Sequence, residues 1–156
     1  MKTYFLSICA ICCYLTGNAH STEYNIFQFG ASKDTSVVQT QAINSAIENC
    51  YRQGGGKVII PSGIYKSGTI FLKDNVELHL ESGVYLYARD NYDDFPVQPQ
   101  ASYRSQKDAG GWVSLIYAVD AKNISITGKG TIDGKLTQTF QCIMYGNIRI
   151  IPQCRL

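Results

Sequence analysis

The sequence predicts an all-β protein, a parallel β-helix with one amphipathic helix near its N-terminus. The first observation is a run of short β-rich segments after Gly56, separated by turn residues: Lys57–Ile60, Ile64–Lys66, Thr69–Leu72, Val76–Glu81 and Val84–Ala88. Strands this short and evenly punctuated fit a sandwich, a barrel or a solenoid. A second observation, an internal repeat, favours the solenoid.

The repeat is a strand motif in which an asparagine precedes alternating aliphatic and polar residues. Copies begin at Asn75, Asn123 and Asn147, so the first spacing is twice the second. A strand that restarts in phase at the shorter of these spacings is typical of the coils of a parallel β-helix. Coincidence among common strand patterns is the alternative. A copy expected near position 99 is absent, because Gln98-Pro99-Gln100 indicates a loop.

The repeat also predicts which side chains face inward. The aliphatic residues are expected to stack rung on rung inside the coils, while Glu77, Ser125 and Arg149 point to solvent. The asparagines suit the corner before each strand, since Asn tolerates left-handed backbone and hydrogen-bonds locally.

One helix is predicted, from Ser36 to about Gln53. Ser36 and Gln39 fit a capping box, in which each side chain bonds the other's backbone amide. Apolar residues then recur at helical spacing: Ala42, Ile43, Ala46, Ile47 and Cys50. A β-helix needs its open end covered, because bare rungs expose a sheet edge and an apolar core. We therefore expect this helix to be a structural cap.

The N-terminal segment, residues 1–19, is typical of a secretory signal peptide. Lys2 supplies the positive start, residues 4–15 are mostly apolar, and Gly17 and Ala19 place small residues before a cut after Ala19. The apolar run is too short to span a bilayer, which needs about 20 residues. Bulky Ile11 before Cys12 disfavours a lipoprotein cut. The mature protein is expected to be secreted or periplasmic and to hold no membrane segment.

Composition argues against several other functions. The chain of 156 residues has a net charge of +2 and no basic run, so no nucleic-acid partner is expected. Cys50, Cys142 and Cys154 remain after the signal peptide, and an odd number predicts no complete disulfide framework. His20 and His79 stand alone, so neither a metal nor another cofactor is expected.

A set of motifs carries a family resemblance across residues 24–134: Phe29-Gly30-Ala31, Thr40 with Ala42-Ile43 and Ala46-Ile47, Gly54-Gly55-Gly56, Pro61 with Gly63 and Tyr65, Asn75-Val76, Asn123-Ile124 and Gly130-Thr131-Ile132-Asp133-Gly134. As a set they resemble the start of the polygalacturonases of glycoside hydrolase family 28, within the pectate lyase-like superfamily. The first half alone is shared with pectate lyase-like domains, including those of phage tail spikes. The Gly-Thr-Ile-Asp-Gly stretch favours the hydrolases.

The resemblance implies a right-handed, single-stranded parallel β-helix that hydrolyses α-linked galacturonan, usually with inversion. A pectic polysaccharide or oligogalacturonide is the implied partner. In the family three aspartates, in Asn-Thr-Asp and Asp-Asp motifs, protonate the leaving oxygen and activate water. Gly-His-Gly and Arg-Ile-Lys motifs complete the site. All four motifs lie downstream of Gly-Thr-Ile-Asp-Gly in the family, and none follows it here.

The acidic residues that remain receive structural interpretations. The pair Asp93-Asp94 lies upstream of Gly-Thr-Ile-Asp-Gly and is interpreted as loop or cap chemistry. Asp133 belongs to the Gly-Thr-Ile-Asp-Gly turn, where we expect its carboxylate to bond backbone amides. The sequence therefore predicts no catalytic residue in this chain.

The last residues, 151–156, depart from the family pattern, and Pro152 cannot donate to a strand ladder. We expect residues 20–156 to be the N-terminal portion of a pectin-lyase-like β-helix domain, truncated or frame-shifted at the C-terminus. Sequencing the DNA past the stop codon tests this, and the absence of a family-like reading in any frame would refute it.

Three interpretations of function remain open. The first is a polygalacturonase-type glycosidase by descent that is itself an inactive fragment. The second is a carbohydrate-binding module of the pectate lyase or tail-spike type. In it Tyr103, Arg104 and Trp112, within the long polar segment 91–112, stack on a sugar ring and pair with its carboxylate. A packed surface loop is the plain alternative for that segment. The third is a remnant that exposes its last rung and aggregates.

Overall fold

The computed structural model describes residues 22–97, 114–134 and 149–150. Within these ranges the strands form three sheets, and every strand pairing is parallel. Sheet A contains, in order, β1 (Glu23–Asn25), β2 (Gly56–Ile60), β5 (Val76–Leu80), β8 (Ser125–Gly128) and β10 (Arg149–Ile150). Sheet B contains β3 (Gly63–Ser67), β6 (Val84–Ala88) and β9 (Thr131–Asp133). Sheet C contains β4 (Ile70–Phe71) and β7 (Ile116–Tyr117).

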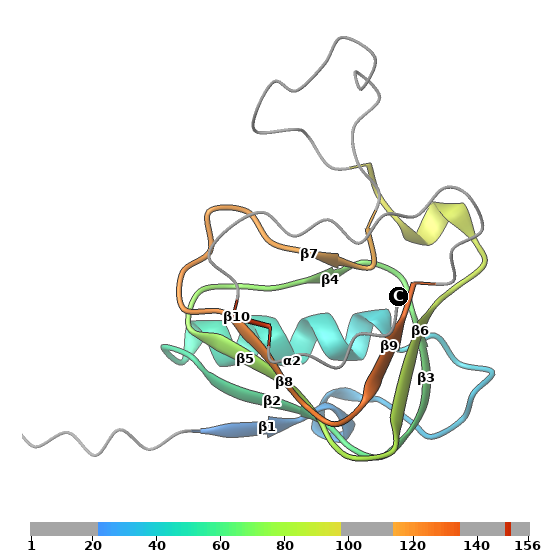
Figure 1. Cartoon of the computed structure of the whole chain (residues 1–156), viewed down its shortest axis with the longest axis horizontal. Helices are drawn as coiled ribbons and strands as arrows, with labels where there is room; N and C mark the ends of the chain where they lie inside the picture. Colours follow the sequence, from blue (N-terminus) through green and yellow to red (C-terminus); the bar gives the residue numbers. More distant parts are fainter. Residues whose placement is uncertain (1–21, 98–113, 135–148, 151–156) are drawn as a thin grey trace, which may run out of the picture.

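The chain passes from sheet A to sheet B to sheet C and then returns to sheet A for the next coil. Figure 1 looks along these coils, with sheet C along the upper side of the outline, sheet A at the lower left and sheet B at the right. Each strand pairs with its counterpart one coil on: Lys57 lies opposite Glu77, and Glu77 lies opposite Ser125. This arrangement confirms the predicted parallel β-helix.

The coils differ in length, in keeping with the copy of the repeat that is absent from the sequence near position 99. β5 pairs directly with β8, so Asn75 and Asn123 belong to adjacent coils despite the long stretch of sequence between them. No described strand lies between β5 and β8 in sheet A. The additional residues of this coil lie between β6 and β7 in the sequence, and the register of sheet A is unaffected because only the strands have to match. The shorter spacing of the repeat holds between β8 and β10, where Ser125 lies opposite Arg149.

Alternate residues of β2, β3, β5, β6 and β8 are buried inside the coils and form the core, as predicted. In sheet A, Val58, Leu78 and Ile126 are register neighbours, and all three are buried. In sheet C, Ile70 lies opposite Ile116, and both are buried as well. Burying one such side chain contributes about 1.5–3 kcal/mol, so each coil stabilises the next through a continuous aliphatic stack.

One corner of the coils is built from residues in the left-handed backbone region. Asn75 and Asn123 have φ of 59° and 54°, and the Nδ2 of Asn123 donates to the Oδ1 of Asn75 at 3.1 Å. Gly55 occupies the same corner one coil earlier with φ of 110°, where an added Cβ would lie 2.5 Å from atoms of Asn75. The predicted role of the asparagines is confirmed for these two, while Asn147 lies outside the described residues.

The helix α2 spans Thr40–Arg52, so it begins later than the sequence predicts. The predicted capping box is wrong. The amide of Ser36 donates to the Oδ1 of Asp34 at 2.8 Å, and no side chain caps the helix at Gln39. Residues before the helix are held extended against β3, because Val38 bridges Lys66 and the amide of Gln39 donates to the Lys66 carbonyl at 2.9 Å. Backbone paired in this way cannot begin a helix.

The predicted apolar face of α2 is confirmed, and the helix lies across the end of the coils (Figure 1). Two side chains attach it to the rim of the first coil. The Nδ2 of Asn44 donates to the Thr69 carbonyl at 2.9 Å, and the Phe71 amide donates to the Oδ1 of Asn44 at 2.9 Å. The Oγ1 of Thr40 accepts from the amide of Gly68 at 2.6 Å. The helix thus satisfies backbone groups that β4 would otherwise present as an open edge.

The Asn44 clamp makes a testable prediction about stability. Replacing Asn44 by alanine leaves the Thr69 carbonyl and the Phe71 amide without these partners, so we expect the free energy of unfolding to fall by about 2 kcal/mol. Urea denaturation followed by circular dichroism measures the change. Asn49→Ala, the same substitution at an exposed position of the same helix, should cost less than about 0.5 kcal/mol. Equal losses in the two variants would contradict the clamp.

Candidate functional site

The outer face of sheet C carries a pair of aromatic side chains. Phe71 and Tyr117 lie opposite each other in register, with ring centroids 6.1 Å apart and an interplanar angle of 80°. Both are partly exposed, whereas Ile70 and Ile116 beside them are buried. The two rings offer apolar faces, and Tyr117 adds a hydroxyl group, so the surface suits stacking on a sugar ring.

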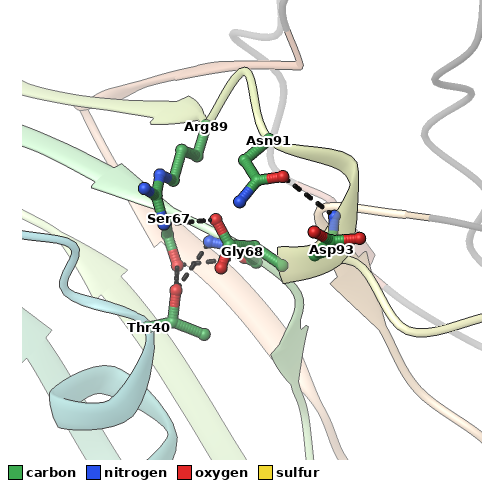
Figure 2. A network of polar contacts seen from close by, with 7 residues as sticks. Thr40, Ser67, Gly68, Arg89, Asn91 and Asp93 are labelled. Atoms are coloured by element: carbon green, nitrogen blue, oxygen red, sulfur yellow. Dashed lines mark hydrogen bonds and ion pairs between the residues drawn. The ribbon is translucent and has the colours of Figure 1, made fainter.

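A short helical turn, η3 (Tyr92–Asp94), is fixed beside the residues around Gly68 (Figure 2). The Nη1 of Arg89 donates to the Oδ2 of Asp94 at 2.7 Å. The Thr69 amide donates to the backbone carbonyl of Asp94 at 3.2 Å. Gly68 allows this approach, since an added Cβ would collide with that carbonyl. Together these contacts hold η3 against the first coil.

Figure 2 shows the rest of this network around Gly68. The Ser67 hydroxyl donates to the Thr40 Oγ1 at 3.2 Å and lies 3.0 Å from the Gly68 carbonyl. The Oδ1 of Asn91 accepts from the amide of Asp93 at 3.2 Å and closes the turn. Cap helix, first coil and η3 are therefore one connected polar unit.

This unit fixes the two ends of the segment that carries the predicted sugar-binding residues. Tyr103, Arg104 and Trp112 themselves lie outside the described residues. The described chain resumes at Ser114, whose carbonyl accepts from the Thr69 hydroxyl at 2.8 Å, and β7 follows at once. The described chain thus stops at Val97, shortly after η3, and resumes directly before β7, the strand that carries Tyr117.

The acidic residues singled out from the sequence lie in different places. Asp94 is ion-paired with Arg89 in the η3 unit, and Asp93 is exposed. Asp133 ends β9 on sheet B, where the hydroxyl of Tyr85 donates to its Oδ2. The sequence reasoning expected backbone partners for Asp133 and missed Tyr85, which lies one coil earlier. The structure therefore does not bring Asp93, Asp94 and Asp133 into one described site.

The Tyr85–Asp133 contact alters the acidity of the phenol. The hydrogen bond to Asp133 raises the pKa of Tyr85 above its ordinary value, and desolvation and the Asp133 charge act in the same direction. The neighbouring Tyr87 ring lies 5.9 Å from Tyr85, so this face of sheet B carries a second aromatic pair.

Sheet A carries a polar ladder that the sequence reasoning also missed. The Thr127 hydroxyl donates to the Oε1 of Glu77 at 2.5 Å, and the Nδ1 of His79 lies 2.7 Å from the same hydroxyl oxygen. Since a carboxylate only accepts, the Thr127 proton points to Glu77, and His79 donates from Nδ1. Glu77 also lies 3.8 Å from the Nζ of Lys57. These contacts could be predicted only if β5 and β8 were already known to be neighbours.

Glu77 and Ser125 face outward as predicted, and the side chain of Arg149 lies outside the described residues. In the part of the chain that the structure describes, no three His, Cys, Asp or Glu side chains gather as metal ligands. The thiol of Cys50 is free and buried against the core, and burial raises its pKa. No helix in the described ranges is long and apolar enough to cross a membrane.

Comparisons with known proteins show which proteins this chain is similar to. No family model matches the chain. The chain is 38% identical over 119 residues to an exo-poly-alpha-D-galacturonosidase of Dickeya chrysanthemi, covering 70% of this chain and 19% of that protein. The solved structure of a family 28 exopolygalacturonase of Yersinia enterocolitica superposes with a TM-score of 0.63 at 36% identity, over 72% of this chain and 21% of that one. The chain is a relative of the family 28 polygalacturonases.

The family 28 relatives are much longer than this chain, which spans 19% to 26% of the length of the polygalacturonases it matches. A second similarity is shorter: the chain is 39% identical over 62 residues to alginate lyase 7 of Azotobacter vinelandii, covering 35% of this chain and 7% of that protein. The first similarity covers 70% of this chain, and the second covers 35%.

A single substitution that removes the Tyr85–Asp133 contact should change the pKa of Tyr85. With Asp133→Asn the pKa of Tyr85 should fall towards its ordinary value, as measured by NMR of [13Cζ]-tyrosine and assigned with Tyr85→Phe. The pKa in the folded state lies above that of the unfolded chain. The hydrogen bond therefore stabilises fully below pH about 10 and is lost as the pH rises through the folded-state value. Asp120→Asn, a matched change at an exposed site, should leave Tyr85 unchanged, and an equal shift there would refute the assignment.

Proposed function

We propose that this chain contributes the framework coils of a polygalacturonase-type hydrolase whose polysaccharide is a pectic galacturonan. The observation that carries the proposal is the 38% identity to an exo-poly-alpha-D-galacturonosidase over 119 residues. The partly exposed Phe71–Tyr117 pair supports a sugar-binding role for sheet C. In this proposal Tyr103, Arg104 and Trp112 extend that face, because their segment comes shortly before β7, the strand that carries Tyr117.

We further propose that the chain binds the polysaccharide without cleaving it. Inverting hydrolysis needs an acid and a base on opposite faces of the bond. Several carboxylates among the described residues are held in ion pairs, as Asp94 is with Arg89 and Glu48 is with Arg52 on α2. Hydrogen bonds from Ser36 lower the pKa of Asp34, which makes that carboxyl group a poor proton donor.

A second candidate function rests on the shorter similarity. The match to alginate lyase 7 supports a coil that recognises alginate, a different acidic polysaccharide, in place of galacturonan. Both candidates need an acidic sugar, so they differ in which uronate binds best.

Two measurements on the purified chain test the proposal. Incubation with polygalacturonate should release no reducing ends, and detectable release would refute the non-cleaving role. Calorimetry should then give heat with oligogalacturonide at millimolar ligand and less with an alginate oligomer. A preference for the alginate oligomer favours the second candidate. Absence of heat with every uronide would contradict both.

Export is the remaining part of the proposal. The layout of residues 1–19 supports removal of a signal peptide after Ala19 during secretion, and these residues lie outside the described ranges. Expressed in a bacterium with its leader, the chain should reach the periplasm or medium. N-terminal sequencing should then start at His20. Ala19→Arg should block the cut because a small residue is required there, whereas Asn18→Ala should not. Recovery of an intact Met1 from wild type would contradict export.

A further inference from the structure

A hollow of about 730 Å³ lies between α2 and the rim of sheet C, at the capped end of the coils. Most of its walls come from α2, and the rest from Phe29, β4 and the turn after β4. The residues that matter for its chemistry are Gln41, Asn44, Glu48, Arg52, Phe71 and Lys73. Its volume is within the range of small-molecule sites, about 300–1,000 Å³.

The hollow has an uncompensated positive charge. The Nε of Arg52 lies 2.9 Å from the Oε1 of Glu48, and the Nζ of Lys73 lies 4.0 Å from its Oε2. Among the described residues that line the hollow, Glu48 is the sole acid between these two cations. One carboxylate cannot neutralise both, so the site carries one positive charge in excess.

Neighbouring side chains restrict the positions of Arg52 and Lys73, but both remain accessible to solvent. The Nζ of Lys73 lies 5.8 Å from the ring centroid of Tyr51, a cation–π contact that restricts where it points. The side chains of Arg52 and Lys73 are 72% and 45% exposed. A ligand can therefore reach both without displacing any packed side chain.

The walls offer a rigid apolar face beside polar groups. Phe71 is partly exposed, and its ring continues the face that Tyr117 begins. Both side-chain polar atoms of Asn44 are committed to β4, so that wall is fixed. Gln41 is exposed on the same flank of the helix and offers an amide to hydroxyl groups. A flat ring, a cation pair and an amide together match a sugar that bears a carboxylate.

We propose that this hollow binds a uronate residue of an acidic polysaccharide. The uronate carboxylate sits between Arg52 and Lys73, and its ring packs on Phe71. A chain lying along sheet C over Tyr117 and Phe71 then ends in the hollow. The ligand class rests on the proposed function, whereas the location rests on the charges and walls of the hollow.

The test is calorimetry of the whole chain with a short oligogalacturonide, an alginate oligomer and neutral galactotriose. In Arg52→Gln/Lys73→Gln the Kd for the bound uronide should rise roughly tenfold, because both charge-assisted hydrogen bonds are lost. Glu48→Gln should lower the Kd about two- to threefold, since it removes the competing carboxylate. Lys33→Gln, an exposed lysine that does not line the hollow, is the matched control and should bind as wild type does. Circular dichroism checks that each variant is folded.

The outcomes separate this site from the proposed function. If wild type binds oligogalacturonide and the double variant binds it equally well, the hollow is not the binding site, while the proposed pectic function stands. If only the alginate oligomer binds and the double variant loses it, the hollow stands and the pectic assignment fails. Equal affinity for galactotriose overturns the hollow. Absence of binding by wild type overturns both.

Discussion

Backbone pairing between equivalent strands of successive coils holds this chain together. In sheet A the register runs from Lys57 to Glu77 to Ser125 without a slip, and sheets B and C follow the same rule. Because each strand is fixed by the one before it, the aliphatic residues must recur on the inner face. The polar residues of successive coils then come into contact on the outer face, as Glu77 and Thr127 do. The core and the surface ladders are two consequences of one register.

The register constrains the strands but not the lengths of the turns between them. Two regions of the chain differ from the regular coil as a result. Between β6 and β7 a coil is enlarged without disturbing sheet A, and η3 fixes the start of the enlargement through Asp94 and Gly68. At the first coil there is no earlier described strand of sheets B and C to pair with. Val38, Thr40 and Asn44 take the place of that strand by bonding the edges of β3 and β4. Both regions border the Phe71–Tyr117 face, which is where we propose that an acidic polysaccharide binds.

The sequence was sufficient to predict the fold class because its signals are local and periodic. The asparagine motif marks a corner that needs positive φ, and the apolar stripe from Ala42 to Cys50 marks the cap helix. The helix start was predicted wrongly, since a capping box is a local signal and the pairing of Val38 with Lys66 is not. The contacts of Asp133 with Tyr85 and of Glu77 with Thr127 join adjacent coils. Local pattern gives no coil length, so it could not tell which distant residues would meet.

β5 and β8 are far apart in the sequence but are direct neighbours in sheet A, and the stacking of the coils depends on this pairing. Glu77→Cys and Ser125→Cys, in a chain whose native cysteines are replaced, test it by disulfide formation under mild oxidation. Neighbouring strands lie about 4.8 Å apart, within the Cα separation of about 4.4–6.8 Å that a disulfide needs. We expect an intramolecular disulfide to form rapidly in this variant, and little disulfide to form when Glu77→Cys is paired with Lys129→Cys, which is out of register. Failure of the 77–125 pair to close would mean that another strand separates the two, at roughly twice that spacing, and would contradict the account.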